Sequence, residues 1–273
     1  MKNQKVVIIT GASNGMGKAA AQVFADHGWI VYGGARRVEK IPNGENIHAV
    51  SLDVIDDESI KSFADTVIKE QHHVDVLINN AGYGENGPAE DTPTDHIRKQ
   101  FDTNFFGAVT LSQLILPTMR KQGSGRIVNI SSIGGDIYSP LGAYYHATKA
   151  ALQQWSDTLD IEVEQFGIRS VVVQPGGTKS SWGSVAVQNI YNNLKPDTAY
   201  KPLVDYMAKV LSDDAPGMGA SVEDLANLFY RAATDEKPKR RYFNNFHDHL
   251  TVIMARSLPG LFRRQVLAGL KGK

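Results

Sequence analysis

Two kinds of hydrophobic pattern alternate along the chain. Short runs rich in valine and isoleucine, bounded by glycine or turn residues, are typical of strands buried on both faces. Between them lie longer segments in which apolar residues recur every three or four positions, as in an amphipathic helix. We expect strands at residues 6–10, 29–35, 47–53, 74–78, 125–130 and 169–174, and helices at 18–27, 57–70, 94–120 and 145–166. This alternation predicts parallel βαβ units in an α/β fold.

The composition narrows the class of protein. Hydrophobic residues make up 42% of the 273 residues and charged residues 21%, which are ordinary globular values and favour one large domain. There is no cysteine, so disulfides and cysteine-ligated metals are excluded, and we predict no metal site. The formal charge of zero argues against a nucleic-acid partner. The first apolar run is too short for a signal peptide or a membrane span, so we expect a cytoplasmic protein.

The charge is concentrated at one end. Residues 237–273 carry nine lysines and arginines and one acid, Asp248. Within this stretch, residues 250–258 and 261–270 have helical apolar periodicity and are separated by Pro259 and Gly260. We expect a basic helical extension that caps a substrate site or contacts another copy of the chain. Contact with a membrane surface is a less favoured alternative.

A glycine-rich turn joins the first expected strand to the first helix. Its spacing is Gly11-x-x-x-Gly15-x-Gly17. Glycines allow backbone amides to approach an anion at a helix N-terminus, so the turn predicts a phosphate site. Tight packing alone is the alternative.

The end of the second strand bears on the choice of cofactor. Where an acid would bind the ribose 2′-hydroxyl of NAD, the chain has Ala35 followed by Arg36 and Arg37. Guanidinium groups suit a phosphate, so this pattern favours NADP, although both could be solvated surface arginines. Asp53, after the third strand, could contact an adenine edge or cap a helix.

Tyr145 and Lys149 form a candidate proton-transfer pair. Four residues apart at the start of a helix, they share one face, and the ammonium could lower the pKa of the phenol. Ser132 would offer a hydrogen bond to a substrate oxygen. Tyr191 and Lys195 have the same spacing, but Pro196 follows and no serine lies thirteen residues upstream, so we interpret that pair as coincidental.

Taken together, these motifs make the chain resemble the NAD(P)-dependent short-chain dehydrogenase/reductase family over residues 5–182. The matching elements, in order, are Thr10-Gly11-x-x-x-Gly15-x-Gly17, Asn79-Asn80-Ala81-Gly82, Asn129-x-Ser131-Ser132, Tyr145-x-x-x-Lys149 and Pro175-Gly176. The resemblance implies a single doubly wound Rossmann-type domain with a mostly parallel seven-stranded sheet. It also implies NAD(P)-linked interconversion of an alcohol and a carbonyl.

The resemblance assigns roles by position. Tyr145 would be the acid/base, Lys149 would hold the nicotinamide ribose, Ser132 would bind the substrate oxygen, and Asn104 would hold a water for proton relay. The implied cofactor contacts are Thr10, Gly11, Ser13, Asn14, Gly15, Met16, Gly17, Arg36, Arg37, Asp53, Asn80, Ala81, Gly82, Tyr145, Lys149, Pro175, Gly176, Gly177, Thr178 and Ser180.

The sequence says least about the residues that bind the substrate. Residues 1–182 would form the cofactor and catalytic core, and 183–220 a substrate loop. Tyr138, Leu141 and Trp182 could wall an apolar pocket for a hydrophobic carbonyl or alcohol, or could simply be packed. The resemblance suggests a homodimer or homotetramer through the helices at 94–120 and 145–166. The alternatives are an NAD-linked enzyme of the same family and a non-catalytic NADP-sensing protein.

Overall fold

The structure is a computed structural model that describes residues 4–178, 182–211 and 219–271. Its strands are β1 Val6–Thr10, β2 Ile30–Ala35, β3 Ile47–Ser51, β4 Val76–Asn79, β5 Gly125–Ile130, β6 Ile168–Gln174 and β7 Arg241–Phe243. Its α-helices are α1 Gly15–Asp26, α2 Asp57–Gln71, α3 Thr94–Phe101, α4 Gly107–Gln122, α5 Ala143–Val163, α6 Trp182–Asn192, α7 Lys201–Leu211, α8 Val222–Thr234, α9 Phe246–Ser257 and α10 Pro259–Lys271. Two short helical turns, η2 Asp102–Phe106 and η3 Ile133–Gly135, also carry residues discussed below.

The seven strands form one sheet in the order β3-β2-β1-β4-β5-β6-β7, and every neighbouring pair is parallel. The chain moves outward from β1 in one direction through β3, then returns to start again at β4. Between β1 and β4 the order therefore reverses, and at such a switch point ligands bind beyond the carboxyl ends of the strands. The predicted α/β fold is confirmed, and the sheet is wholly parallel.

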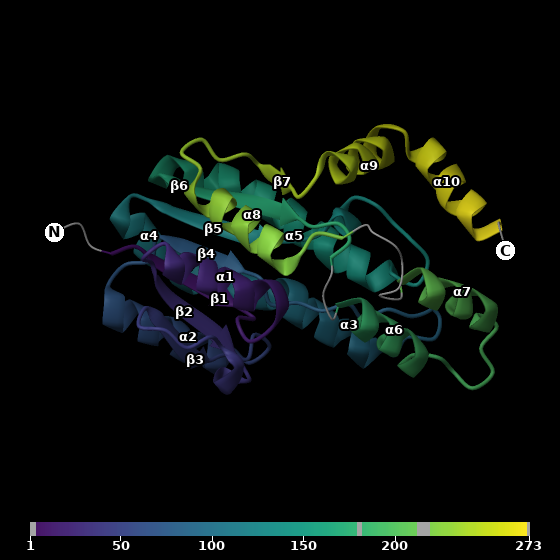
Figure 1. Ribbon diagram of the computed structural model, residues 1–273, viewed down its shortest axis with the longest axis horizontal. Coiled ribbons are helices and arrows are strands. Elements are labelled where there is room, and N and C mark those ends of the chain that lie inside the picture. Colours follow the sequence, from purple (N-terminus) through teal and green to yellow (C-terminus); the bar gives the residue numbers. More distant parts are fainter. Residues whose placement is uncertain (1–3, 179–181, 212–218, 272–273) are drawn as a thin grey trace.

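Both faces of the sheet are covered at its centre, which explains why β1 and β4 lack polar alternation, whereas the edge strand β3 is partly exposed. In β1, Val7 and Ile9 pack with α1 and α8 on one face, whereas Val6 and Ile8 pack with α2, α4 and α5 on the other (Figure 1). Phe24 of α1 is fully buried on the first face. Successive strand residues thus serve two separate hydrophobic cores.

The segment expected as one helix over 94–120 differs in its middle. There α3 passes through a π-helical turn, η2, before α4 begins. A π turn widens the helix by one residue and is frequent at functional sites. The buried residue Asn104 lies in this turn. The apolar periodicity continues across the turn, so the sequence pattern does not reveal it.

The C-terminal segment forms the two helices expected from its periodicity, α9 and α10, which extend beyond the sheet (Figure 1). The extension begins with β7, a short strand that the hydrophobic pattern did not identify. The ring of Tyr138 packs edge-on against Phe262, with centroids 5.1 Å apart. Within the described ranges, none of the helices has the length and apolar character needed to cross a membrane.

Candidate active site

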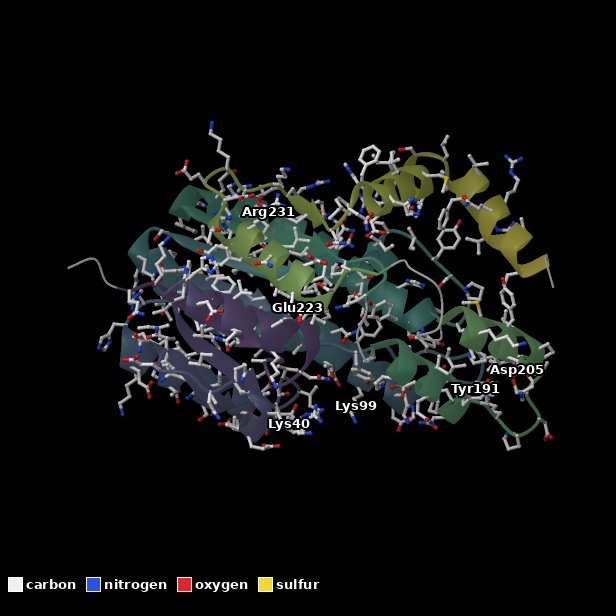
Figure 2. All side chains as sticks on the ribbon, viewed as in Figure 1. Lys40, Lys99, Tyr191, Asp205, Glu223 and Arg231 are labelled. Atoms are coloured by element: carbon white, nitrogen blue, oxygen red, sulfur yellow. The ribbon has the colours of Figure 1, made fainter. Side chains whose placement is uncertain are left out.

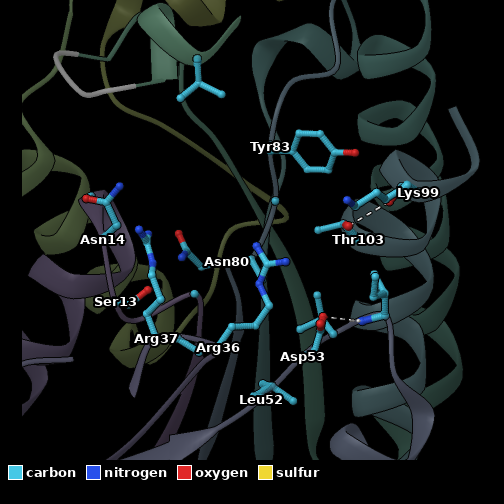
Figure 3. A pocket seen from close by; sticks show the side chains of 18 of the residues that line it. Ser13, Asn14, Arg36, Arg37, Leu52, Asp53, Asn80, Tyr83, Lys99 and Thr103 are labelled. Atoms are coloured by element: carbon cyan, nitrogen blue, oxygen red, sulfur yellow. Dashed lines mark hydrogen bonds between the residues drawn. The ribbon is translucent and has the colours of Figure 1, made fainter. Parts of the chain in front are cut away.

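A cleft of about 660 Å³ opens at the carboxyl ends of β1, β2 and β4. It is lined by the glycine-rich turn, by the residues that follow β2 and β3, and by residues 80–83 after β4. Side chains from α3, η2 and α6 form the opposite wall (Figure 3). The cleft therefore lies at the switch point of the sheet, where the expected cofactor contacts converge.

The glycine-rich turn is shaped for close backbone approach. Gly11 has a φ of +71°, and a Cβ on Gly17 would come within 2.5 Å of the Gly11 carbonyl oxygen. The hydroxyl of Thr10 accepts hydrogen bonds from the backbone amides of Asn80 (3.0 Å) and Ala81 (2.9 Å), which fixes this turn against the loop after β4. The first amides of α1 thus face a glycine-lined cradle that fits a pyrophosphate.

The arginines after β2 lie at one end of this cleft. Arg36 and Arg37 are exposed and line it, and neither forms an ion pair with a carboxylate among the described residues. Figure 3 shows Arg37 on the side of Asn14 and Arg36 on the side of Tyr83. Two cations with no acidic partner in this part of the chain suit a phosphate group.

Asp53 lines the same end of the cleft, and the sequence allows it either to contact an adenine or to cap a helix. The cap of α2 is Asp56, whose carboxylate accepts from the amides of Glu58 (3.0 Å) and Ser59 (3.4 Å). Asp53 instead accepts from the amide of Ile55 at 3.3 Å and faces the cleft. The helix-cap alternative for Asp53 is wrong.

The candidate catalytic residues gather beyond Gly82. A Cβ on Gly82 would lie 3.3 Å from Lys149 Nζ and 3.1 Å from Asn104 Oδ1, so these groups adjoin the cleft. Lys149 Nζ donates to the Ile130 carbonyl at 2.9 Å and lies 5.9 Å from the centre of the Tyr145 ring. Both Tyr145 and Lys149 are buried. Helix α5 and the end of β5 thus bring together what the sequence predicted.

Burial shifts the pKa values of both Tyr145 and Lys149. It raises the pKa of the Tyr145 phenol, and a hydrogen bond with Ser132 lowers that pKa by a smaller amount. Burial also lowers the pKa of the Lys149 ammonium to about 8. The expectation that Lys149, together with a positively charged cofactor, lowers the phenol pKa stays a prediction. Desolvation disfavours the phenolate, and its effect is the larger one.

Asn104 is held at both ends of its amide. Its Oδ1 accepts from the Tyr83 amide at 3.0 Å, and its Nδ2 donates to the Tyr83 carbonyl at 2.9 Å and to Thr148 Oγ1 at 3.1 Å. These bonds tie the π turn to the loop after β4 and to α5. Its assignment to a water relay stays a prediction.

The loop after β6 adjoins the serine loop and does not line the cleft. The amide of Ile133 donates to the Pro175 carbonyl at 3.0 Å, so this loop and the serine loop are joined. Gly177 accepts from the amide of Ala220 at 3.0 Å, and Thr178 Oγ1 donates weakly to the Gly176 carbonyl at 3.4 Å. Ser180 lies outside the described residues.

Of the candidate substrate contacts, two are placed away from the cleft lining. Leu141 is buried in a small cluster with Ile190, Val204 and Met207, so it packs the substrate loop onto the core. Tyr138 is 42% exposed and contacts the C-terminal extension. The side chain of Trp182 is not among those that the structure describes.

Several cleft residues were missed by the sequence analysis. They are Leu52, Val54, Ile55, Tyr83, Glu85, His96, Lys99, Thr103, Val185, Asn189 and Asn192. Lys99 and Thr103 lie four residues apart and so share one face of the helical segment α3–η2, but nothing in the sequence pattern points that face at the cleft. The lysine adds a third cation near Arg36 (Figure 3).

Tyr191 and Lys195, which the sequence analysis interprets as a coincidental pair, contact different residues. Tyr191 does not line the cleft and donates to Asp205 on α7 at 3.3 Å (Figure 2), and Lys195 donates to the carbonyl of Glu90 at 2.8 Å. Neither contact involves a serine.

Comparison with known proteins decides the family. The family model described as short chain dehydrogenase matches residues 5–189. The chain belongs to the short-chain dehydrogenase family. It is thus an NAD(P)-dependent oxidoreductase acting on CH–OH groups.

Three similar proteins illustrate the relationship. This short-chain dehydrogenase is 35% identical to the uncharacterized oxidoreductase YusZ of Bacillus subtilis over 249 residues, which cover 87% of each chain. It is 41% identical over 172 residues to the 3-ketodihydrosphingosine reductase of Bacteroides thetaiotaomicron, covering 63% of each. A short-chain dehydrogenase from Streptomyces avermitilis has 32% identity and a TM-score of 0.79, covering 93% of this chain and 95% of that one.

Proposed function

We propose that this short-chain dehydrogenase is an NADP-dependent reductase of a hydrophobic carbonyl compound, with Tyr145 as the proton donor. The main support for the proposal is that one cleft has suitable groups at both of its ends. At one end lie Arg36 and Arg37, which have no acidic partner among the described residues, and at the other, beyond Gly82, lie Tyr145 and Lys149.

The chemistry divides between cofactor and chain. A bound nicotinamide supplies or accepts the hydride. Tyr145, kept protonated by burial, donates its phenolic proton to the carbonyl oxygen, which stabilises the negative charge that develops there. Ser132 positions that oxygen by a hydrogen bond. Lys149 offers its ammonium to the ribose hydroxyls. A protonated phenol has a proton to give to the carbonyl oxygen in the reductive direction.

Substitution of Arg36 tests the proposed preference for NADP over NAD. Arg36→Ala is expected to weaken NADPH binding by tenfold or more, because a charge-assisted contact to the 2′-phosphate is lost, at about 1.4 kcal/mol for each factor of ten. NADH binding should change by less than about twofold. Fluorescence titration with both cofactors measures the two dissociation constants.

Lys40→Ala is the matched control for this experiment. Lys40 is an exposed cation close to Arg36 in the chain, but it does not line the cleft, so its removal should leave both affinities unchanged. Equal weakening of NADPH and NADH by Arg36→Ala would contradict the assignment and favour an NAD-linked enzyme. Binding of both cofactors with no turnover on any substrate would favour a sensing protein.

The substrate class rests on one relative. The relative from Bacteroides thetaiotaomicron is named a 3-ketodihydrosphingosine reductase, so a long-chain ketone heads the panel to be tested. Short ketones, aldehydes and ring ketones complete it. Oxidation of NADPH, followed by its absorbance, reports turnover, and a preference for small polar carbonyls would contradict a hydrophobic substrate.

We propose that the protein forms a homo-oligomer through the outer face of α4 and α5. Ile161 is 77% exposed on this face, and the neighbouring Phe166 is 37% exposed. Burial of Ile161 against a second copy would remove this apolar surface from water. Sedimentation velocity of the wild type and of Ile161→Glu tests the assignment, which requires the variant to dissociate.

A further inference from the structure

Helix α9 reaches both loops that surround the proposed catalytic serine. Its inward residues include Asp248, Val252 and Ala255, which are buried. The carboxylate of Asp248 packs directly on Gly176, in the loop after β6. Two turns further along, Arg256 pairs with Asp136, in the loop after β5. One helix of the basic extension therefore contacts both loops at the carboxyl edge of the sheet (Figure 1).

Asp136 is an unusual partner for a surface arginine. Its side chain is only 1% exposed, whereas that of Arg256 is 53% exposed. The arginine reaches Asp136 Oδ1 through Nε and a terminal nitrogen, and the other carboxylate oxygen accepts from Gln174 Nε2. No other cation pairs with this carboxylate in the described part of the chain. A buried carboxylate that loses its only cation is strongly destabilised.

A short chain of contacts leads from this ion pair to Ser132. The amide of Asp136 donates to the Ile133 carbonyl at 2.8 Å and closes the η3 turn that Ser132 begins. Gln174 Nε2, besides meeting Asp136, lies 3.4 Å from the Ser132 carbonyl oxygen. The Ser132 carbonyl also accepts from Gln153 Nε2 at 2.9 Å, so the serine backbone is held partly by Gln153 and partly by groups that also hold the carboxylate.

We propose that Arg256 is a positioning residue for Ser132 and acts through Asp136. Its cation compensates a buried carboxylate that would otherwise leave its place, and the η3 turn would move with it. The C-terminal extension then completes the catalytic site from 120 residues away in the chain. The link to activity rests on the proposed function, because only there does Ser132 bind the substrate oxygen.

Hydrogen–deuterium exchange tests the positioning without substrate or cofactor. In Arg256→Ala, amides of residues 133–136 should exchange at least about fivefold faster, because the η3 turn opens more often. A peptide from β1 serves as the internal reference. Arg263→Ala is the matched control, since Arg263 is an exposed arginine of the same extension with no ion pair among the described residues. It should leave exchange unchanged.

Kinetics on the same variants measure the effect on Ser132. Arg256→Ala should lower kcat and kcat/KM together by about tenfold, as expected when a transition-state contact weakens, while the NADPH dissociation constant stays within about twofold. Asp136→Asn combined with Arg256→Ala removes both charges and keeps an acceptor for Gln174. This double variant should recover both slow exchange and most of kcat.

The outcomes separate the two proposals. Unchanged exchange at 133–136 in Arg256→Ala, the same increase in Arg263→Ala, or a double variant as impaired as Arg256→Ala would overturn the positioning role. Exchange that responds as expected in a protein that reduces no carbonyl would uphold the positioning and overturn the proposed function.

Discussion

Tyr145→Phe is expected to lower kcat for carbonyl reduction by about three orders of magnitude, within the usual contribution of a positioned general acid. The substitution removes one oxygen and leaves the ring, so the buried packing of Tyr145 is retained. The carbonyl oxygen then receives no proton as negative charge develops on it. NADPH binding should change by less than about threefold, because most of the cleft lies elsewhere. Stopped-flow or steady-state absorbance of NADPH measures the loss.

Tyr191→Phe is the control for this experiment. It makes the same chemical change in the other Tyr-x-x-x-Lys pair, whose hydroxyl meets Asp205 on the surface (Figure 2). It should keep nearly full activity. A Tyr145→Phe enzyme that retains more than about a tenth of wild-type kcat would remove Tyr145 from the proton-transfer role.

Local patterns predicted the parts of this molecule that depend on local physics. The valine and isoleucine runs located β1 and β4 because these strands are buried on both faces, whereas β3, at the edge of the sheet, is partly exposed. The glycine spacing located the cradle at α1 because only glycine permits the approach of Gly17 to Gly11. Tyr145 and Lys149 share a face because they lie one turn apart on α5.

Contacts between distant segments were beyond the same reasoning. Nothing near Arg256 in the sequence points to Asp136, because the pairing depends on how α9 docks after β7. The π turn at Asn104 leaves the apolar periodicity intact, so it was read as ordinary helix. Spacing likewise places a cation near Tyr145, but the desolvation that raises the phenol pKa depends on the whole fold, so the sequence does not reveal it.

Lys149→Met is expected to abolish most activity and to stabilise the cofactor-free protein. Burial lowers the Lys149 pKa from 10.5 to about 8, so at pH 7 the folded chain carries a charged ammonium in a site that disfavours it. A shift of this size corresponds to about 3 kcal/mol against folding. Methionine removes that penalty but leaves the Ile130 carbonyl without its donor, which offsets about 1 kcal/mol. The midpoint of thermal unfolding at pH 7 should therefore rise by about 3–6 °C.

The pH dependence identifies the ammonium as the cause. Below about pH 8 the lysine is protonated in both the folded and the unfolded chain, and the full penalty applies. Between about pH 8 and 10.5 the folded chain releases the proton first, so the penalty shrinks and wild-type stability rises relative to the variant. The variant should be the more stable protein near pH 7, and by about pH 10.5 the order should reverse, because only the lost hydrogen bond to the Ile130 carbonyl, worth about 1 kcal/mol, then remains. A variant less stable than wild type at pH 7, or a difference that does not change with pH, would show that the charge of Lys149 does not oppose folding.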